Sequence, residues 1–210
     1  MGKLTFAQTA VVITIMLMAV WGGCGGSTAI TRFYLLDSMA EPAEEVGAGA
    51  AGHEDIVIGV GPVNIPEYLK RSEIVTRDGR NKLLLADFDL WAEPLEENIS
   101  RVLAKNLSIL LPSDRIAVFP WRGMPSIQYQ IKLDLIRFDG EQDGHALLDA
   151  RWMILSGKEK EILLMRRSAF REPIVSKTYE AIVVAQSRLI EKLSRDIAAA
   201  LGSLHDNTSS

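Results

Sequence analysis

The sequence predicts an α+β fold: a mixed, mostly antiparallel β-sheet with two main helices packed on one face, in a single domain. Residues 127–135 and 146–154 alternate apolar and polar side chains, and residues 161–170 continue them as a third strand. Such a meander with one polar face is typical of a sheet whose other face is covered. Residues 95–111 and 178–201 repeat apolar side chains every three or four positions, as amphipathic helices do.

The first 23 residues resemble a lipoprotein signal peptide. Their uninterrupted apolar run, residues 10–21, is about a dozen residues long, which is short of the roughly 20 that span a bilayer. Two glycines and the only cysteine, Cys24, follow it. This is the pattern of a lipobox, in which Cys24 becomes the lipidated first residue, although Trp21 stands where leucine is usual. An uncleaved anchor or a plain signal peptide is the alternative.

The rest of the chain divides by composition. Residues 24–31 form a predicted lipidated tether, and residues 32–202 a periplasmic domain. Within the domain, residues 38–54 form a predicted flexible acidic loop, and residues 203–210 follow it as a disordered tail. A domain without cysteine has no disulfide and depends on its hydrophobic core. The formal net charge of −4 argues against nucleic acid as a partner.

The first half of the domain reads as strands and a hairpin. Residues 32–37 and 55–65 have strand character, and Gly61-Pro62 predicts a bulge or a sheet edge in the second. Residues 66–69 suit a single turn. Residues 73–76 and 82–86 flank Asp-Gly, a hairpin signal. Basic residues crowd the hairpin: Lys70, Arg71, Arg77, Arg80 and Lys82. They form either a solvated tip or a contact with lipid phosphates or an acidic partner.

Boundary residues define the helices. Pro94 precedes the first helix and Pro112 ends it, whereas Thr178 caps the last helix and Gly202 closes it. Between the helices, residues 116–119 form a short strand, and the polar run 139–144 is predicted to be a loop. Acidic residues surround Trp91 before the first helix: Asp87, Asp89 and Glu93.

No motif in the sequence indicates a reaction centre. There is no HExxH, no cysteine pair, no GxSxG and no P-loop. We therefore expect no cofactor and no metal, and the residue chemistry alone favours a binding or assembly module over an enzyme. The acidic cluster around Trp91 lacks a nearby nucleophile or metal ligand.

The sequence resembles the PqiC/YmbA-type lipoproteins, auxiliary subunits of MCE-type ABC transport systems. The most specific block is GPV-x-x-PEYL with its downstream Arg77, followed by Trp91-Ala-Glu-Pro-Leu. The matching stretches are RFYLL (32–36), IGVGPVNIPEYLKRSEIVTR (58–77), DLWAEPLEENISRVLAKNL (89–107), RFDG (137–140) and YEAIVVAQSRLIEKLSRDIA (179–198).

The resemblance implies a non-catalytic outer-membrane lipoprotein that faces the periplasm. Its partners would be an MCE-domain tunnel protein and, indirectly, an inner-membrane permease and ATPase, and it would form a homo-oligomeric ring. Gly25 stands where an inner-membrane retention signal has Asp, which favours the outer membrane. The alternatives are a structural lipoprotein of another envelope assembly or secretion machine, and a periplasmic hydrolase.

The motif residues divide into two groups. We expect one group to lie at the edge of the sheet and to meet the partner or a neighbouring subunit: Pro66, Glu67, Tyr68, Leu69 and Arg77. We expect the other group to maintain the fold: Gly61, Pro62, Trp91 and Leu95.

Overall fold

The computed structural model describes residues 30–41, 56–111, 115–121, 126–141 and 143–208. The predicted signal peptide, Cys24 and most of the acidic loop 38–54 lie outside these residues. The chain divides into two compact units, residues 1–30 and 31–210, and the following description concerns the second. None of the helices among the described residues is both long and apolar enough to cross a membrane.

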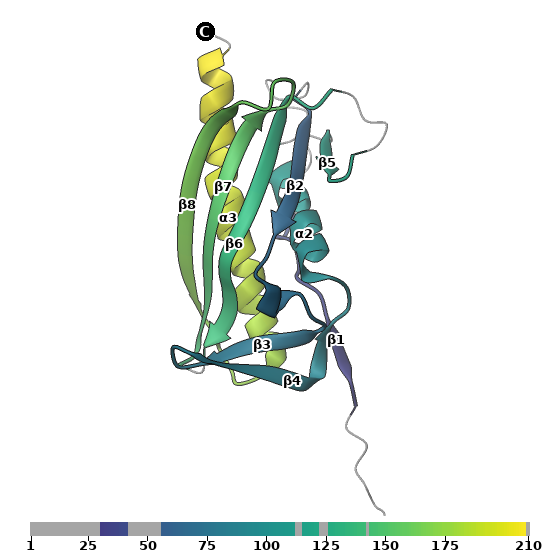
Figure 1. The fold of residues 1–210 in the computed structure, drawn as a ribbon, viewed down its shortest axis with the longest axis vertical. Helices are drawn as coiled ribbons and strands as arrows, with labels where there is room; N and C mark the ends of the chain where they lie inside the picture. Colours follow the sequence, from purple (N-terminus) through teal and green to yellow (C-terminus); the bar gives the residue numbers. More distant parts are fainter. Residues whose placement is uncertain (1–29, 42–55, 112–114, 122–125, 142, 209–210) are drawn as a thin grey trace, which may run out of the picture. The chain divides into compact units, whose positions relative to one another are not determined.

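In the described part of the chain, eight strands form one mixed sheet (Figure 1). The strands are β1 (Arg32–Tyr34), β2 (Ile58–Asn64), β3 (Glu73–Asp78), β4 (Lys82–Trp91), β5 (Ile116–Val118), β6 (Tyr129–Glu141), β7 (His145–Ser156) and β8 (Ile162–Pro173). The helices are α2 (Leu95–Leu110) and α3 (Tyr179–Thr208), and a short 3-10 turn, η1 (Glu67–Leu69), links β2 to β3. The predicted α+β class is confirmed.

Strand β6 is the centre of the sheet. One of its edges pairs with β7 in an antiparallel ladder, and β7 continues to β8. Its other edge changes partner, because β2 pairs with it as far as Asp134 and β3 joins it only at Gly140, both in parallel. Strand β4 then adds to β3, β1 to β4 and β5 to β2.

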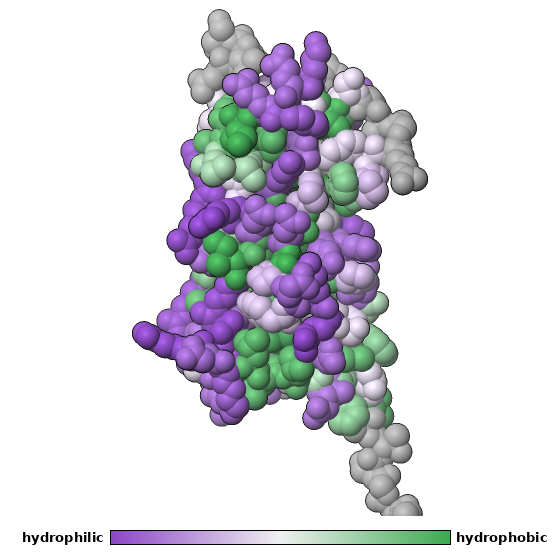
Figure 2. Space-filling model, in the orientation of Figure 1, coloured by the Kyte–Doolittle hydropathy of each residue, from purple (hydrophilic) through white to green (hydrophobic). Residues whose placement is uncertain are grey.

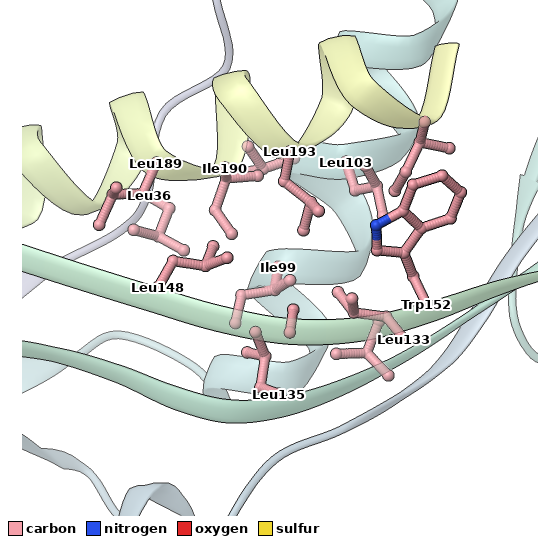
Figure 3. Packing of buried hydrophobic residues seen from close by; sticks show 14 of the residues in the cluster. Leu36, Ile99, Leu103, Leu133, Leu135, Leu148, Trp152, Leu189, Ile190 and Leu193 are labelled. Atoms are coloured by element: carbon pink, nitrogen blue, oxygen red, sulfur yellow. The ribbon is translucent and has the colours of Figure 1, made fainter. Parts of the chain in front are cut away.

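Both helices pack on one face of the sheet, as predicted (Figure 3). Both β6 and β7 alternate apolar and polar side chains, and their register places the inward apolar side chains opposite each other, for example Leu133 opposite Trp152. These contact the apolar stripes of the helices, including Leu103 of α2 and Leu193 of α3. Each fully buried side chain of this size contributes about 1.5–3 kcal/mol, so this layer dominates the stability of the domain.

Two buried asparagines of α2 fix the segment that follows β1. Asn98 Oδ1 accepts a hydrogen bond from the backbone N–H of Leu36 at 2.7 Å, and Asn106 Oδ1 accepts one from Met39 at 2.8 Å. Asn106 is fully buried and its Nδ2 donates to Ser194 Oγ of α3 at 3.1 Å. A polar residue within the apolar stripe of α2 thus joins both helices to the first segment of the domain.

Several predicted boundaries are wrong for identifiable reasons. Strand β4 continues past residue 86 because β1 supplies a second partner for its last residues. Strand β6 includes Asp139, Gly140 and Glu141, which we assigned to a loop, because β7 and β3 pair with them. Helix α3 continues through Gly202 to Thr208, in place of a disordered tail, since Leu204 keeps its contact with the core.

The bulge predicted at Gly61-Pro62 is present. The register between β2 and β6 shifts between Val60 and Val63, and the peptide bond before Pro62 is cis. Strand β5 pairs only with Ile58–Val60 of β2, so the bulge lies where this side of β2 loses its strand partner. Thr178 Oγ1 accepts a hydrogen bond from the N–H of Ala181, which confirms the predicted cap of the last helix.

We predict that Asn106→Leu lowers the free energy of unfolding by about 1–3 kcal/mol, because it removes the acceptor of Met39 N–H in a buried place while keeping the side-chain volume. Lys105→Leu, at the exposed neighbouring position, is the control. Urea denaturation of both variants checks this, and equal midpoints would contradict the role of Asn106.

Candidate partner-binding site

The Pro-Glu-Tyr-Leu turn lies where β6 changes its partner. Residues 65–72 connect β2 to β3, and both strands pair with the same edge of β6 at different heights. Tyr68 is half-buried in this turn, and its hydroxyl donates to Asp139 Oδ2 of β6 at 3.2 Å. Asp139 therefore holds the turn against the central strand, although no sequence motif marks it as a partner of Tyr68.

Asp139 is a fully buried carboxylate that joins three segments of the chain. Arg77 of β3 donates to its Oδ2 from Nε at 3.2 Å and from a terminal nitrogen at 3.1 Å. Arg137 donates from Nε to Oδ1 at 2.9 Å and also reaches Glu141 at 2.6 Å. The Arg77 guanidinium lies 5.7 Å from the centre of the Tyr68 ring. Buried charge is tolerated only when it is paired in this way.

The electrostatics of the cluster keep Tyr68 protonated. Burial raises the pKa of Tyr68 above its ordinary value, and the negative charge of Asp139 raises it further. Arg77 opposes this effect but does not reverse it. The phenol is therefore a hydrogen-bond donor at neutral pH and has no readily available phenolate for chemistry.

The predicted location at the sheet edge is wrong for Arg77. Strand β3 lies between β4 and β6, so Arg77 belongs to an interior strand. Leu69 is buried in the core, and the Arg77 side chain is only 17% exposed. Glu67 differs, because its side chain is 85% exposed and pairs with Lys70 at the surface, and Pro66 is half-buried.

The residues expected to maintain the fold differ in their burial, and Pro62 is half-buried. Trp91 and Leu95 are buried in the core. Gly61 has φ +117°, and a Cβ there would lie 2.8 Å from Cβ of Phe119, so only glycine suits the position. Its carbonyl accepts a hydrogen bond from Gln130 Nε2 at 2.9 Å.

A surface groove brings the two most specific sequence blocks together. It has a volume of about 470 Å³, and it lies between the residues that follow η1 and the residues that join β4 to α2. The backbone N–H of Trp91 donates to the carbonyl of Ser72 at 2.6 Å and so joins the two blocks that line the groove. The lining residues are Lys70, Arg71, Ser72, Trp91, Ala92, Glu93, Pro94, Leu95 and Glu96.

This groove suits recognition of another molecule better than catalysis. Among its lining residues Arg71 is exposed and Glu96 is half-buried, and Glu93 forms an ion pair with Arg101. Within the described ranges, no group of three or more His, Cys, Asp or Glu side chains could hold a metal ion. Arg71 reads from the sequence only as part of a basic hairpin, because its proximity to the Trp91 block depends on strand order.

We predict that Arg77→Ala lowers the free energy of unfolding by about 3 kcal/mol, because Asp139 keeps its burial and loses one of its two cations. Arg80→Ala, at the exposed hairpin tip, should change it by less than about 0.5 kcal/mol. Thermal and urea unfolding of the two variants check this. If Arg77→Ala is as stable as Arg80→Ala, the cluster is not a structural requirement.

Solved structures share this fold. A protein from Xanthomonas campestris matches with a TM-score of 0.70 at 13% identity, covering 86% of this chain and 100% of that chain. An uncharacterized protein matches with a TM-score of 0.67 at 18% identity, covering 82% and 99%. At such identities the likeness shows the fold alone.

Sequence comparison gives the family. Intermembrane transport lipoprotein PqiC of Escherichia coli (strain K12) and that of Shigella flexneri are each 26% identical over 141 residues, which is 67% of this chain and 72% of theirs. The model of the ABC-type transport auxiliary lipoprotein component family matches residues 34–198, from β1 into α3. The chain therefore belongs to the family of ABC-type transport auxiliary lipoprotein components.

Proposed function

We propose that the chain is a periplasmic lipoprotein anchored in the outer membrane, and a non-catalytic subunit of an MCE-type ABC transport system. That system moves lipids between the inner and outer membranes and supports envelope integrity. The observation that carries the proposal is the family match over residues 34–198. The name of the PqiC relatives, intermembrane transport lipoproteins, agrees with it.

The anchor in this proposal is a lipid on Cys24. The family consists of lipoproteins, and Cys24 is the only cysteine in the sequence, directly after the apolar run and two glycines. The amino acid after it, glycine, supports the outer membrane as the destination. Energy comes from the permease and ATPase of the inner membrane, which contact this chain only through the MCE-domain tunnel protein.

The non-catalytic role is supported by how the buried carboxylates are used. Asp139 is held by two arginines and a tyrosine, and Asp89 by Arg32 and the Tyr34 hydroxyl. A carboxylate that accepts several such bonds from cations and hydroxyl groups is poorly suited to abstract a proton. The use of both carboxylates to join neighbouring strands supports the non-catalytic role.

The groove between Arg71 and the Trp91 block is the proposed docking point for the MCE-domain protein or for a neighbouring subunit of a ring. Its lining combines exposed Lys70 and Arg71, half-buried Glu93 and Glu96 and buried Trp91. Arginine and aromatic residues are enriched at protein interfaces. Tyr68, Leu69 and Arg77 contribute to it indirectly, because they fix the turn from which Lys70 and Arg71 project.

We predict that cells fed a labelled fatty acid incorporate it into the wild-type chain and not into Cys24→Ser. The variant should then leave the membrane fraction. Detection by in-gel fluorescence after fractionation checks this. Equal labelling of the two chains would place the lipid elsewhere, and no labelling of either would remove the anchor from the proposal.

We also predict that Arg71→Glu reduces recovery of the MCE-domain protein in detergent co-purification by about tenfold, because one reversed charge at an interface costs about 1.4 kcal/mol or more. Arg80→Glu at the hairpin tip is the matched control, and both variants should melt with the wild type. Mass spectrometry of the eluate identifies the partner. Components of a secretion machine in place of transport proteins would favour the structural-lipoprotein alternative, and equal recovery with both variants would exclude the groove.

A further inference from the structure

Strands β1 and β4 carry an aromatic face that nothing in the described residues covers. Phe33 is 65% exposed and Phe88 is 45% exposed, and both are large apolar side chains. In the parallel register Phe33 lies opposite Leu90, and Phe88 precedes Asp89, the partner of Arg32 in that register. Leu35, just after β1, is 50% exposed. We call Phe33, Leu35 and Phe88 the aromatic face.

The opposite side of the same two strands is firmly fixed. Arg32 binds Asp89 through two contacts, at 2.7 and 2.9 Å, and the Tyr34 hydroxyl donates to Asp89 at 2.8 Å. Asp89 and Trp91 are buried. Because successive side chains of a strand point to opposite faces, this anchoring forces Phe33 and Phe88 outward. Their exposure is therefore a consequence of strand pairing and not of a loose chain end.

Further apolar surface lies at the same end of the domain. Leu85 of β4 is 45% exposed, and Val175, in the connection from β8 to α3, is 79% exposed. Figure 2 shows apolar surface over β3 and β4 at the lower end of the view, where the β1–β4 pair also lies in Figure 1. Apolar side chains collected at one end of a domain commonly mark a contact surface.

The short distance along the chain from Cys24 to β1 indicates that the aromatic face lies near a membrane. The second compact unit begins at Thr31, directly before β1. Cys24 precedes Thr31 by seven residues, which span at most about 25 Å when fully extended. A lipid on Cys24 therefore keeps β1 and its aromatic face within about 25 Å of the bilayer surface.

We propose that the aromatic face inserts into the headgroup region of the membrane that carries Cys24, and so orients the domain on the membrane. This inference rests on the lipid anchor of the proposed function. Phe and Leu side chains of membrane-associated segments bury at the boundary between headgroups and acyl chains, and attachment through a lipid is strengthened by a second contact of this kind. Phe33, Leu35 and Phe88 would supply that contact.

A second copy of the chain is a less suitable occupant. Stable protein interfaces bury about 800 Å² on each partner, and three partly exposed side chains provide only a fraction of this area. The face is also not purely apolar, because the charged residue Asp87 is exposed beside Phe88 on β4. Headgroups accommodate such a charge because the interface is hydrated.

The experiment ties the N-terminus of the domain to a vesicle, so that it does not depend on lipidation of Cys24 in the cell. A hexahistidine tag replaces residues 1–23, Cys24 becomes serine, and vesicles of phosphatidylethanolamine and phosphatidylglycerol contain a nickel-chelating lipid. The chain then lacks cysteine, so Phe88→Cys carries a single polarity-sensitive fluorophore. Phe119→Cys is the matched control, because Phe119 is 50% exposed and follows β5. Phe33→Cys provides a second probe of the aromatic face.

We expect the emission of the fluorophore at position 88 to shift to shorter wavelength on the vesicles. Lipids brominated near the headgroup should quench it severalfold more than the fluorophore at position 119. Unchanged, unquenched emission at positions 33 and 88 would overturn the inference. A blue shift without bromine quenching, rising with protein density, would overturn it in favour of a second copy. Absence of a fatty acid on Cys24 in cells would refute the anchor alone and would leave this readout unaffected.

Discussion

The buried carboxylate of Asp139 is the constraint on which the arrangement of this sheet depends. A charge removed from water must find partners, and the two arginines and the tyrosine that satisfy Asp139 come from β3, from β6 and from the turn between β2 and β3. Strand β3 meets β6 through only two register pairs, Thr76 with Gly140 and Arg77 with Glu141. The ion pair between Arg77 and Asp139 reinforces this short junction, and with it the attachment of β4 and β1.

The same constraint positions the surface groove. Once Tyr68 is bound to Asp139, the turn has one place to lie, and Lys70 and Arg71 project from its end. The Trp91 backbone bonds to Ser72 beside them, so the block that starts α2 is brought to the block that ends η1. Two stretches about twenty residues apart in sequence thus form one surface. The buried contacts of Tyr68 with Asp139 and of Trp91 with Ser72 hold the two stretches in place.

Local pattern predicted the elements whose signals are local. The alternation of residues 127–135, the stripe of α2, the cap at Thr178 and the Gly61-Pro62 bulge were all readable, because each depends on neighbouring residues. The change of partner along β6 was not, because strand order is a long-range property. The prediction of a loop at Asp139 failed for the same reason. A polar run such as residues 139–144 indicates exposure to solvent unless the arginines that pair with a buried carboxylate are known. The RFDG block contains both Asp139 and Arg137, and Arg77 lies in another of the family stretches, so the resemblance pointed to these residues without showing that they meet.

Strand β4 connects the two surfaces proposed for this domain. Phe88 lies on the aromatic face, and Trp91, three residues later, forms part of the groove floor, which is a separation of about 10 Å along a strand. A domain oriented by Phe33 and Phe88 would therefore present its groove next to the membrane surface and not at the far end of the molecule. A partner bound there would itself end close to the bilayer. That geometry would suit the proposed role of a subunit that joins a periplasmic conduit to its membrane, and it would follow from one strand that carries both surfaces.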